Sequence, residues 1–415
     1  METRRQSRRD FLRAMGVGAA SAALPRLTPD AGAATGQPNI LVMLSDDMGW
    51  GQPGFQGGQI IPTPNLDRLA TEGVNLTQFY VQPVCTPTRA CLLTGRYAFR
   101  TGTVIRFTAN DTAGMLLDER TLAQALKDAG YFTGIVGKWH LGEWQKAHLP
   151  MQRGFDRQYG HYSALIDYYL HTRNGVYDWH RNEQPLDEDG YSTDLIADET
   201  IRLIREHGGS RPFFLYVPFN AVHGPHQDQA PRELIEKHTQ TKVKNPAQAA
   251  QVECMDAAIG RILSALDAKG IRDNTLVMFF NDNGGPAGVG PNGPYRGGKS
   301  SYLEGGIRVA CLMRWPGKLR AGSAVDEPLH VVDMYPTFVK LAGGSLKQEL
   351  PIDGSDAWAT IAQGKPTPHE EIVHGLKVIR VGDWKYIDKD AAYYGWKSEG
   401  TQLGACPSNR KIVLA

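Results

Sequence analysis

The chain has 415 residues, of which 41% are hydrophobic and 21% are charged. This composition supplies enough apolar side chains for a sizeable core, and it excludes collagen-like, largely disordered and small disulfide-scaffold proteins. At roughly 150 residues per domain, the length fits two or three domains, or one large α/β domain with a small appendage. The 45 Lys and Arg side chains balance 44 Asp and Glu without a run of like charge, so no nucleic-acid partner is expected.

The first 33 residues have the pattern of a twin-arginine export signal. Arg8 and Arg9 precede an uncharged stretch over 14–24, and residues 31–33 offer an A-x-A cleavage site. The stretch is shorter than the roughly 20 residues of a membrane-spanning helix, so no stable membrane anchor is expected. We predict a periplasmic or secreted protein that the twin-arginine translocase exports. The alternative is a basic, disordered N-terminal arm.

The chain has five cysteines, an odd number, and their spacing matches neither a zinc ribbon nor a C-x-x-C redox pair. Because twin-arginine export carries folded protein, we expect most of these thiols to be buried as small apolar side chains. The five are Cys85, Cys91, Cys254, Cys311 and Cys406.

Strand and helix patterns alternate along the chain. Continuous apolar runs predict strands buried on both faces of a parallel sheet, at 38–44, 131–136, 212–218 and 275–280. Apolar residues at helical spacing predict helices at 119–129, 194–207 and 252–269. The alternation indicates an α/β fold with a large, mostly parallel sheet flanked by helices.

Polar side chains follow each of these predicted strands at the point where the strand ends. In chain order they are Asp46 and Asp47, Lys138 and His140, His223, and Asp282 and Asn283. In an open α/β sheet, ligands bind at this edge. Each residue alone also fits a helix cap, a turn or a loop histidine with satisfied hydrogen bonds. Their shared position favours one common site.

The strongest local motif runs from Cys85 to Arg96. It reads C-x-P-x-R, then an apolar pair and T-G-R, and a second long motif follows over 130–140. The two together resemble the signatures of the type I sulfatases, in which the cysteine is oxidised to formylglycine. Within that family the chain looks most like bacterial relatives of N-acetylgalactosamine-4-sulfatase (arylsulfatase B). The alternative for Cys85 is a buried structural thiol.

The resemblance extends over most of the chain after the export signal and implies an alkaline-phosphatase-like fold. It divides the chain into a catalytic α/β domain over 34–370 and a small antiparallel C-terminal subdomain over 371–415. The sequence lacks the L-Y-D-L and D-P-x-E tail that is usual in the family. We therefore expect this subdomain to be abbreviated.

The resemblance also implies a metal site and a modified nucleophile. It assigns a divalent cation to Asp46, Asp47, Asp282, Asn283 and the modified Cys85. Oxygen ligands suit Ca²⁺, with Mg²⁺ as the second choice. Formylglycine would be made by a formylglycine-generating enzyme, a transient partner. One hydroxyl of its hydrate attacks the sulfur of a sulfate ester, and the second lets the aldehyde reform and expel sulfate.

The resemblance also assigns roles to the charged and titratable residues around the predicted nucleophile. Arg89 holds the nucleophile at the start of a helix expected to run to about residue 96. Lys138 and Lys299 bind sulfate oxygens. His223 or Lys299 protonates the leaving oxygen, and His140 is the base for breakdown of the covalent intermediate. The alternative for Lys299 is a solvated loop lysine.

The sequence leaves the substrate open between an aryl sulfate, a sulfated amino sugar and another sulfated glycan. The aromatic-rich stretch over 159–189, expected to be a rim loop, fits either sugar stacking or local packing. Three other functions compete: a formylglycine-dependent phosphonate monoester or phosphodiester hydrolase, a hydrolase with unmodified Cys85 as nucleophile, and an inactive exported glycan-binding protein.

Overall fold

The computed structural model describes residues 36–108, 111–207, 209–388 and 412–414. The predicted export signal over 1–33 and Cys406 lie outside the described residues. Within the described ranges, none of the helices combines the length and the apolar character needed to cross a bilayer.

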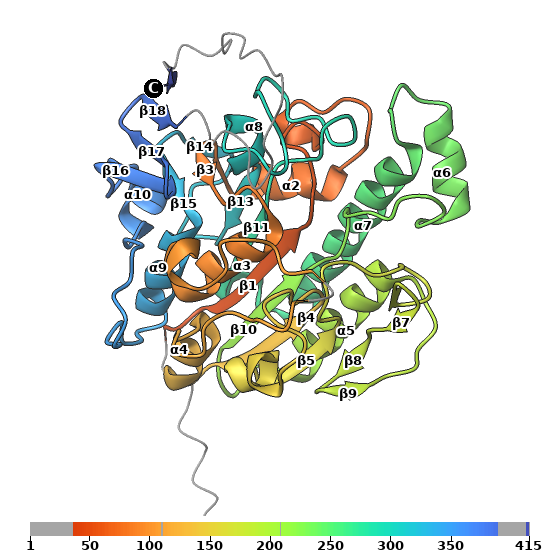
Figure 1. The fold of residues 1–415 in the computed structure, drawn as a ribbon. Coiled ribbons are helices and arrows are strands. Elements are labelled where there is room, and N and C mark those ends of the chain that lie inside the picture. The colour runs from red at the N-terminus through yellow and green to blue at the C-terminus, as the bar shows by residue number, and fades with distance from the viewer. Residues whose placement is uncertain (1–35, 109–110, 208, 389–411, 415) are drawn as a thin grey trace, which may run out of the picture.

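A ten-stranded sheet forms the centre of the molecule (Figure 1). From one edge to the other the strands are β14 (Ser323–Val325), β2 (Val74–Leu76), β13 (Cys311–Arg314), β11 (Thr275–Asn281), β1 (Asn39–Ser45), β10 (Phe213–Pro218), β4 (Phe132–Val136), β5 (Arg157–Gly160), β8 (His180–Arg181) and β9 (Gln184–Pro185). The five strands from β11 to β5 run parallel, and Val42 of β1 pairs with Tyr216 of β10 and Met278 of β11. The predicted large, mostly parallel sheet is confirmed.

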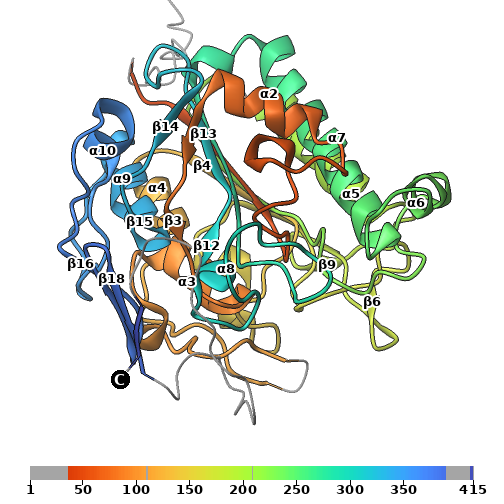
Figure 2. The same ribbon diagram turned by 90° about the horizontal axis from the view of Figure 1, so that it is seen from above.

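Helices cover both faces of this sheet, which is why its central strands are apolar throughout. On β1, Val42 faces one buried cluster and Leu41 faces the other. The first cluster lies against α3 (Cys85–Thr94), α4 (Leu122–Asp128), α9 (Met334–Leu341) and α10 (Trp358–Gln363). The second lies against α2 (Pro64–Glu72), α5 (Ser192–His207) and α7 (Pro246–Lys269), with α6 (Arg232–Thr239) outside α7. Figure 2 shows the two helix layers from above.

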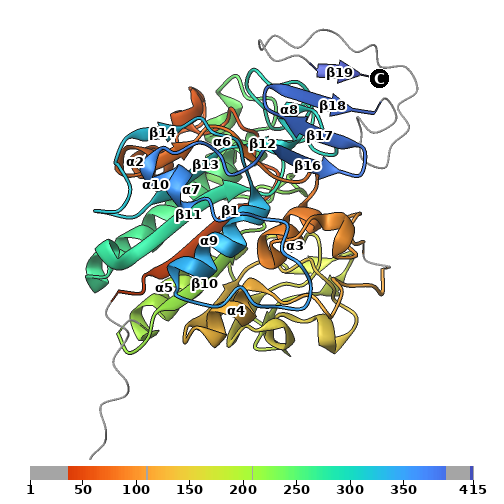
Figure 3. The ribbon, with the colours of Figure 1, turned by 90° about the vertical axis from the view of Figure 1, so that its left-hand side faces the viewer.

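Three short sheets complete the fold. β3 (Phe79–Tyr80), β12 (Arg308–Val309) and β15 (Leu329–His330) form one, and β6 (Thr172–Arg173) and β7 (Val176–Tyr177) form a hairpin. The C-terminal sheet has β16 (Glu371–Gly375), β17 (Val378–Val381), β18 (Trp384–Ile387) and β19 (Ile412–Leu414). Its first three strands are antiparallel, as predicted, whereas β19 pairs parallel to β18. Figure 3 shows this sheet beside α8 (Glu304–Ile307).

All three predicted helices begin at other residues than the sequence pattern predicts, and α5 begins at Ser192, two residues before the predicted start. α4 begins at Leu122 instead of residue 119, because Thr121 caps its N-terminus and forms a capping box with Gln124. α7 begins at Pro246, because Asn245 caps it there and extends the helix by six residues before the predicted start.

The expectation of a rim loop over 159–189 is wrong in part, because the end of β5 and the strands β6 to β9 lie in this stretch. Its aromatic side chains mainly pack locally. Trp179 and Tyr168 are buried, and the Trp179 ring lies 4.5 Å from the stacked ring of His171, also buried. These three rings are therefore core side chains and are not free to stack on a sugar.

Candidate active site

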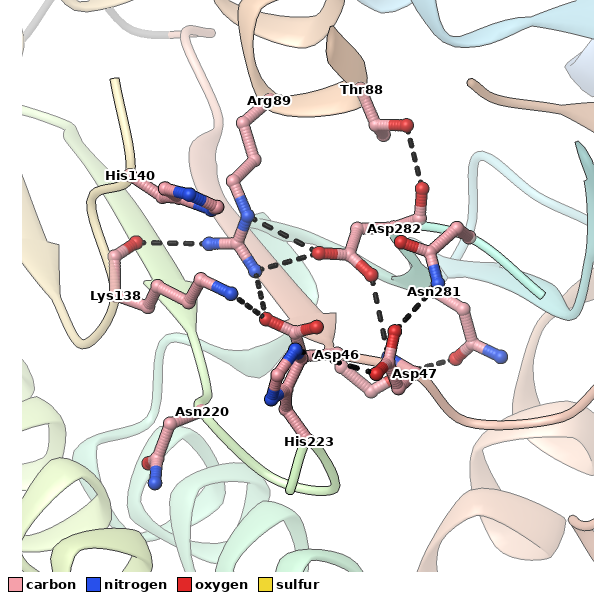
Figure 4. Close-up of polar contacts among 12 residues, drawn as sticks. Asp46, Asp47, Thr88, Arg89, Lys138, His140, Asn220, His223, Asn281 and Asp282 are labelled. Atoms are coloured by element: carbon pink, nitrogen blue, oxygen red, sulfur yellow. Dashed lines mark hydrogen bonds and ion pairs between the residues drawn. The ribbon is translucent and has the colours of Figure 1, made fainter. Parts of the chain in front are cut away.

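The carboxyl ends of four parallel strands bring the predicted polar residues together (Figure 4). Asp46 and Asp47 follow β1, Lys138 and His140 follow β4, His223 follows β10, and Asp282 and Asn283 follow β11. All of them are buried except His223, which is partly buried. Parallel strands end at the same sheet edge, so segments far apart in the sequence meet here.

Cys85 is the first residue of α3 and is 1% exposed. Its Sγ and one carboxylate oxygen each of Asp46 and Asp282 all lie within 4.8 Å of one another. Burial raises the pKa of the Cys85 thiol, and the charges of Asp46 and Asp282 add to this rise against the opposing effect of Lys138. An unmodified Cys85 is therefore protonated and a poor nucleophile.

Arg89 lies one turn after Cys85 on α3 and joins three of the converging segments. Its Nη2 donates to Asp282 Oδ2 at 2.8 Å and to Asp46 Oδ2 at 3.0 Å. Its Nη1 donates to the backbone oxygen of Lys138 at 2.9 Å. The guanidinium is fully buried, so these charge-assisted hydrogen bonds fix the helix to the strand ends.

Two lysines complete the charge pattern. Lys138 Nζ forms an ion pair with Asp46, and Lys299 Nζ lies 2.7 Å from Asp47 Oδ2. With Arg89, three cations thus balance the carboxylates of Asp46, Asp47 and Asp282. A bound divalent cation would make the site net positive, as the binding of an anionic ester requires. The Lys299 side chain is thus part of this cluster and is not a solvated loop lysine.

The side chains fit a hard divalent cation. Asp46 Oδ1 and Asn283 Oδ1 are buried oxygens that receive no hydrogen bond from the described residues. Burial and the nearby charge of Asp46 raise the pKa of Asp282 to about 7. Crowded carboxylates and unpaired oxygens are the surroundings that Ca²⁺ or Mg²⁺ stabilises, whereas zinc favours nitrogen and sulfur ligands. A ring nitrogen of His223 and one carboxylate oxygen each of Asp46 and Asp47 also lie within 4.8 Å of one another, so His223 is a neighbour of the possible cation site.

The two histidines differ in their proton positions. His140 Nε2 lies 2.8 Å from the backbone oxygen of Phe107 and must donate to it, while the buried Nδ1 has no partner among the described residues. His223 Nδ1 lies 2.7 Å from the backbone oxygen of Gly224 and also donates. Burial, reinforced by Lys299, lowers the pKa of His223 to about 4. Burial, reinforced by Lys138, also lowers the pKa of His140. Both imidazoles are therefore neutral at pH 7. The nitrogen without a proton is Nδ1 in His140 and Nε2 in His223, and this Nε2 lies 3.5 Å from Asp47 Oδ2.

The backbone is strained at this site. Asp47 has φ 65°, His140 has φ 59° and Ser300, next to Lys299, has φ 68°, all in the left-handed region that costs non-glycine residues energy. Gly284 follows Asn283, and a Cβ there would lie 1.8 Å from the backbone oxygen of Gly305. Only glycine fits this close approach.

Two further residues position the site and were not among the predicted site residues. Thr88 Oγ1 donates to the backbone oxygen of Asp282 at 2.6 Å and accepts from the backbone N–H of Gln82 at 2.9 Å. Asn281 Nδ2 donates to the backbone oxygen of Met48 at 2.6 Å and so ties β11 to the segment after β1. Thr88 lies inside the cysteine motif and Asn281 directly precedes Asp282, a predicted metal ligand. These two positions were the signals in the sequence that could have identified them.

Comparisons with known proteins agree with this geometry. The family model "Sulfatase" matches residues 38–345. The chain is 36% identical to arylsulfatase J of Mus musculus, covering 89% of this chain and 67% of that protein. It is 35% identical to N-acetylgalactosamine-6-sulfatase of Canis lupus familiaris, covering 90% and 74%.

The fold also matches solved structures. The structure described as Ps i-CgsB in complex with k-i-k-neocarrahexaose superimposes with a TM-score of 0.78 at 32% identity, covering 84% of this chain and 83% of that chain. The expected alkaline-phosphatase-like fold of the sulfatases is thereby confirmed. Because the family match includes every strand end and the helix that form the site, the protein belongs to the sulfatase family and is a hydrolase of sulfate esters.

Proposed function

We propose that the protein hydrolyses sulfate monoesters with position 85 oxidised to formylglycine and a divalent cation, Ca²⁺ before Mg²⁺, in the adjoining carboxylate site. The observation that carries the proposal is the placement of Cys85 at the start of α3, within 4.8 Å of carboxylate oxygens of Asp46 and Asp282. The start of a helix also favours the negative charge of a sulfate.

When bound, the cation polarises a sulfate oxygen and favours the deprotonated nucleophile, and hydrated formylglycine supplies two geminal hydroxyls. The residues Asp46, Asp47, Asp282 and Asn283 would hold this cation. Arg89 fixes α3, and with it position 85, against the carboxylates through its bonds to Asp46 and Asp282. Lys138 and Lys299 bind the sulfate oxygens and stabilise negative charge that develops on them.

The histidine tautomers distinguish the proton-transfer roles. The free Nδ1 of His140 fits the base that removes a proton when the aldehyde reforms and sulfate leaves. His223 carries its proton on Nδ1, toward Gly224, so its Nε2 has none to give. Lys299, whose ammonium is paired with Asp47, is therefore our choice to protonate the leaving oxygen.

We extend the proposal to sulfated sugars as substrates. The support is that one similar structure was solved with a carrageenan-type hexasaccharide and one relative is named for a sulfated amino sugar. The relatives are named as an arylsulfatase, a 6-sulfatase and a steryl-sulfatase, so the 4-sulfatase specificity stays a prediction. Export by the twin-arginine route likewise stays a proposal.

The test combines mass spectrometry with turnover. In purified active protein, the peptide with Cys85 should carry the aldehyde, about 18 Da lighter than cysteine because sulfur is exchanged for oxygen and two hydrogens are lost. Cys85→Ala should abolish hydrolysis of 4-nitrophenyl sulfate while the protein stays folded, and Cys91→Ala, six residues further on α3, serves as the control. Full activity in preparations that contain only unmodified Cys85 would refute the proposal and favour the thiol nucleophile.

A further inference from the structure

A cavity of about 490 Å³ lies beside the candidate active site and has no role in the proposed chemistry. Its walls come from the segments 51–61, 242–248 and 288–291. This volume is within the range of roughly 300–1,000 Å³ that is typical of ligand pockets. We call it the Lys242–Lys244 pocket, after the two cations in its wall.

The walls of the pocket continue the loops that carry the proposed metal ligands. Gln52 lies five residues after Asp47, and Val289 lies six residues after Asn283. The two loops are joined where they reach the pocket, because Gly51 N–H donates to the backbone oxygen of Pro291 at 3.0 Å. At no more than roughly 3.6 Å per residue, the Cα atoms of Gln52 and Asp47 are within about 18 Å of each other.

The lining is positively charged. Lys242 and Lys244 are its only charged residues, both are exposed, and neither has an ion-pair partner among the residues that the structure describes. An anionic group in the pocket would therefore not have to displace a carboxylate from either lysine. The lysines of the active site differ in this respect, because Lys138 and Lys299 are both paired with aspartates.

The rest of the lining suits a sugar ring. Ile60, 47% exposed, and Val289 supply apolar surface for the C–H face of a ring. Gln52 and Gln248 supply buried amides that bond to each other, with Gln52 Nε2 to Gln248 Oε1 at 2.8 Å. This hydrogen bond holds the two amides together in the pocket wall.

We infer that the Lys242–Lys244 pocket binds a second anionic sugar of the same oligosaccharide whose sulfate ester reacts at position 85. The inference rests on the proposed function and makes the substrate class more specific: a glycan with at least two anionic units. The second unit carries a sulfate or a carboxylate, which the two lysines bind, while its ring lies against Ile60. A small aryl sulfate has no second anionic unit, so it offers the two lysines nothing to bind.

The experiment compares Lys242→Ala/Lys244→Ala with the control Lys318→Ala/Lys365→Ala, two exposed lysines outside the pocket. Binding of a carrageenan hexasaccharide and of a chondroitin sulfate hexasaccharide is measured by calorimetry in the Cys85→Ala background, which needs no turnover. For whichever hexasaccharide binds, the pocket variant should bind about tenfold more weakly, as expected for two exposed charge contacts, and the control should be unchanged. The difference should shrink at high salt.

Kinetics separate this inference from the proposed function. In the protein with intact Cys85, the pocket variant should keep its kcat/KM on 4-nitrophenyl sulfate within about twofold and raise the KM for the hexasaccharide. Equal hexasaccharide affinity in the pocket and control variants, or no binding of either hexasaccharide, overturns the inference even when the aryl sulfate is hydrolysed. If the wild-type protein does not hydrolyse the aryl sulfate, the proposed function is refuted. The binding measurement then still tests whether the pocket binds the hexasaccharide.

Discussion

At the scale of single residues, the candidate site contains buried polar atoms that form no hydrogen bond with any described residue. Asp46 Oδ1, Asn283 Oδ1 and His140 Nδ1 are buried and unpaired among the described residues. A buried polar atom without a partner costs about 1–3 kcal/mol. The proposed cation would offset this cost for the two oxygens, and the proposed proton-transfer role would account for the nitrogen.

A prediction at this scale concerns Asp282. Asp282→Asn keeps the shape and one acceptor for Arg89 but removes a carboxylate, so Ca²⁺ affinity should fall at least about tenfold. Calorimetry and the rise of Tm on adding Ca²⁺ measure this loss, and chelation should remove the activity of the unmutated protein. Asp256→Asn is the control, because Asp256 caps α2 through the backbone N–H of Leu66 at 2.8 Å. Unchanged Ca²⁺ affinity in Asp282→Asn would contradict the metal assignment.

At the scale of secondary-structure elements, capping decides where helices begin. Thr121 Oγ1 accepts from the backbone N–H of Gln124 at 3.1 Å and donates to the backbone oxygen of Arg153 at 2.6 Å. Gln124 Oε1 in turn accepts from the backbone N–H of Thr121 at 2.8 Å. Apolar spacing alone would start α4 at residue 119. These capping bonds make the helix begin at Leu122 instead.

Removing the cap should destabilise the protein without affecting the chemistry. Thr121→Ala should lower the free energy of unfolding by about 1–2 kcal/mol, because it leaves N-terminal N–H groups of α4 unpaired. Denaturant titration measures the loss. Thr121→Ser keeps the hydroxyl and should restore most of the stability, and equal stabilities of the Ala and Ser variants would show that the cap contributes nothing.

At the scale of the whole molecule, a buried ionic network attaches the C-terminal sheet to the catalytic domain. Glu304 of α8 accepts from Lys385 Nζ of β18 at 3.0 Å and from Tyr80 Oη of β3 at 2.9 Å, and Arg380 of β17 bonds to the same Tyr80 oxygen. Gly305, the next residue, donates to the backbone oxygen of Arg296 at 2.8 Å. The network therefore also supports the loop that carries Lys299.

Replacing Glu304 should weaken this attachment strongly. Glu304→Gln leaves the buried Lys385 without a carboxylate, and breaking such a pair typically costs about 3–5 kcal/mol. Denaturant titration measures the loss, with the exposed Glu370→Gln as the control. A loss below about 1 kcal/mol would show that the network does not hold the sheet.

The same carboxylate predicts a dependence of stability on pH. Burial alone would raise the pKa of Glu304, but Lys385 and Arg308 outweigh it and lower the pKa from 4.5 to about 2. A carboxyl group with a lowered folded-state pKa stabilises fully above its unfolded pKa and loses this contribution as the pH falls. The stability difference between wild type and Glu304→Gln should therefore shrink between pH 4.5 and 2. A difference that stays constant over this range would contradict the ionic interpretation.

The sequence by itself determined the α/β class, the central strands and the residues at their carboxyl ends. Continuously apolar strands such as β1 and β11 predict burial on both faces of the sheet. Because the strands are parallel, the polar residues that follow them meet at one edge of the sheet. The cysteine motif determined the family resemblance, because its residues lie within one short segment around Cys85 and need no tertiary contact to be read.

Only the tertiary structure decided how the charges pair. Lys299 meets Asp47 across 252 positions of the chain, and Glu304 meets Lys385 across 81, and no local pattern encodes such distances. It also decided that Trp179 is a core side chain and that three wall segments enclose the Lys242–Lys244 pocket. Local propensity and periodicity report neighbours along the chain, whereas pairing, burial and cavities depend on which distant segments the packed sheet brings together.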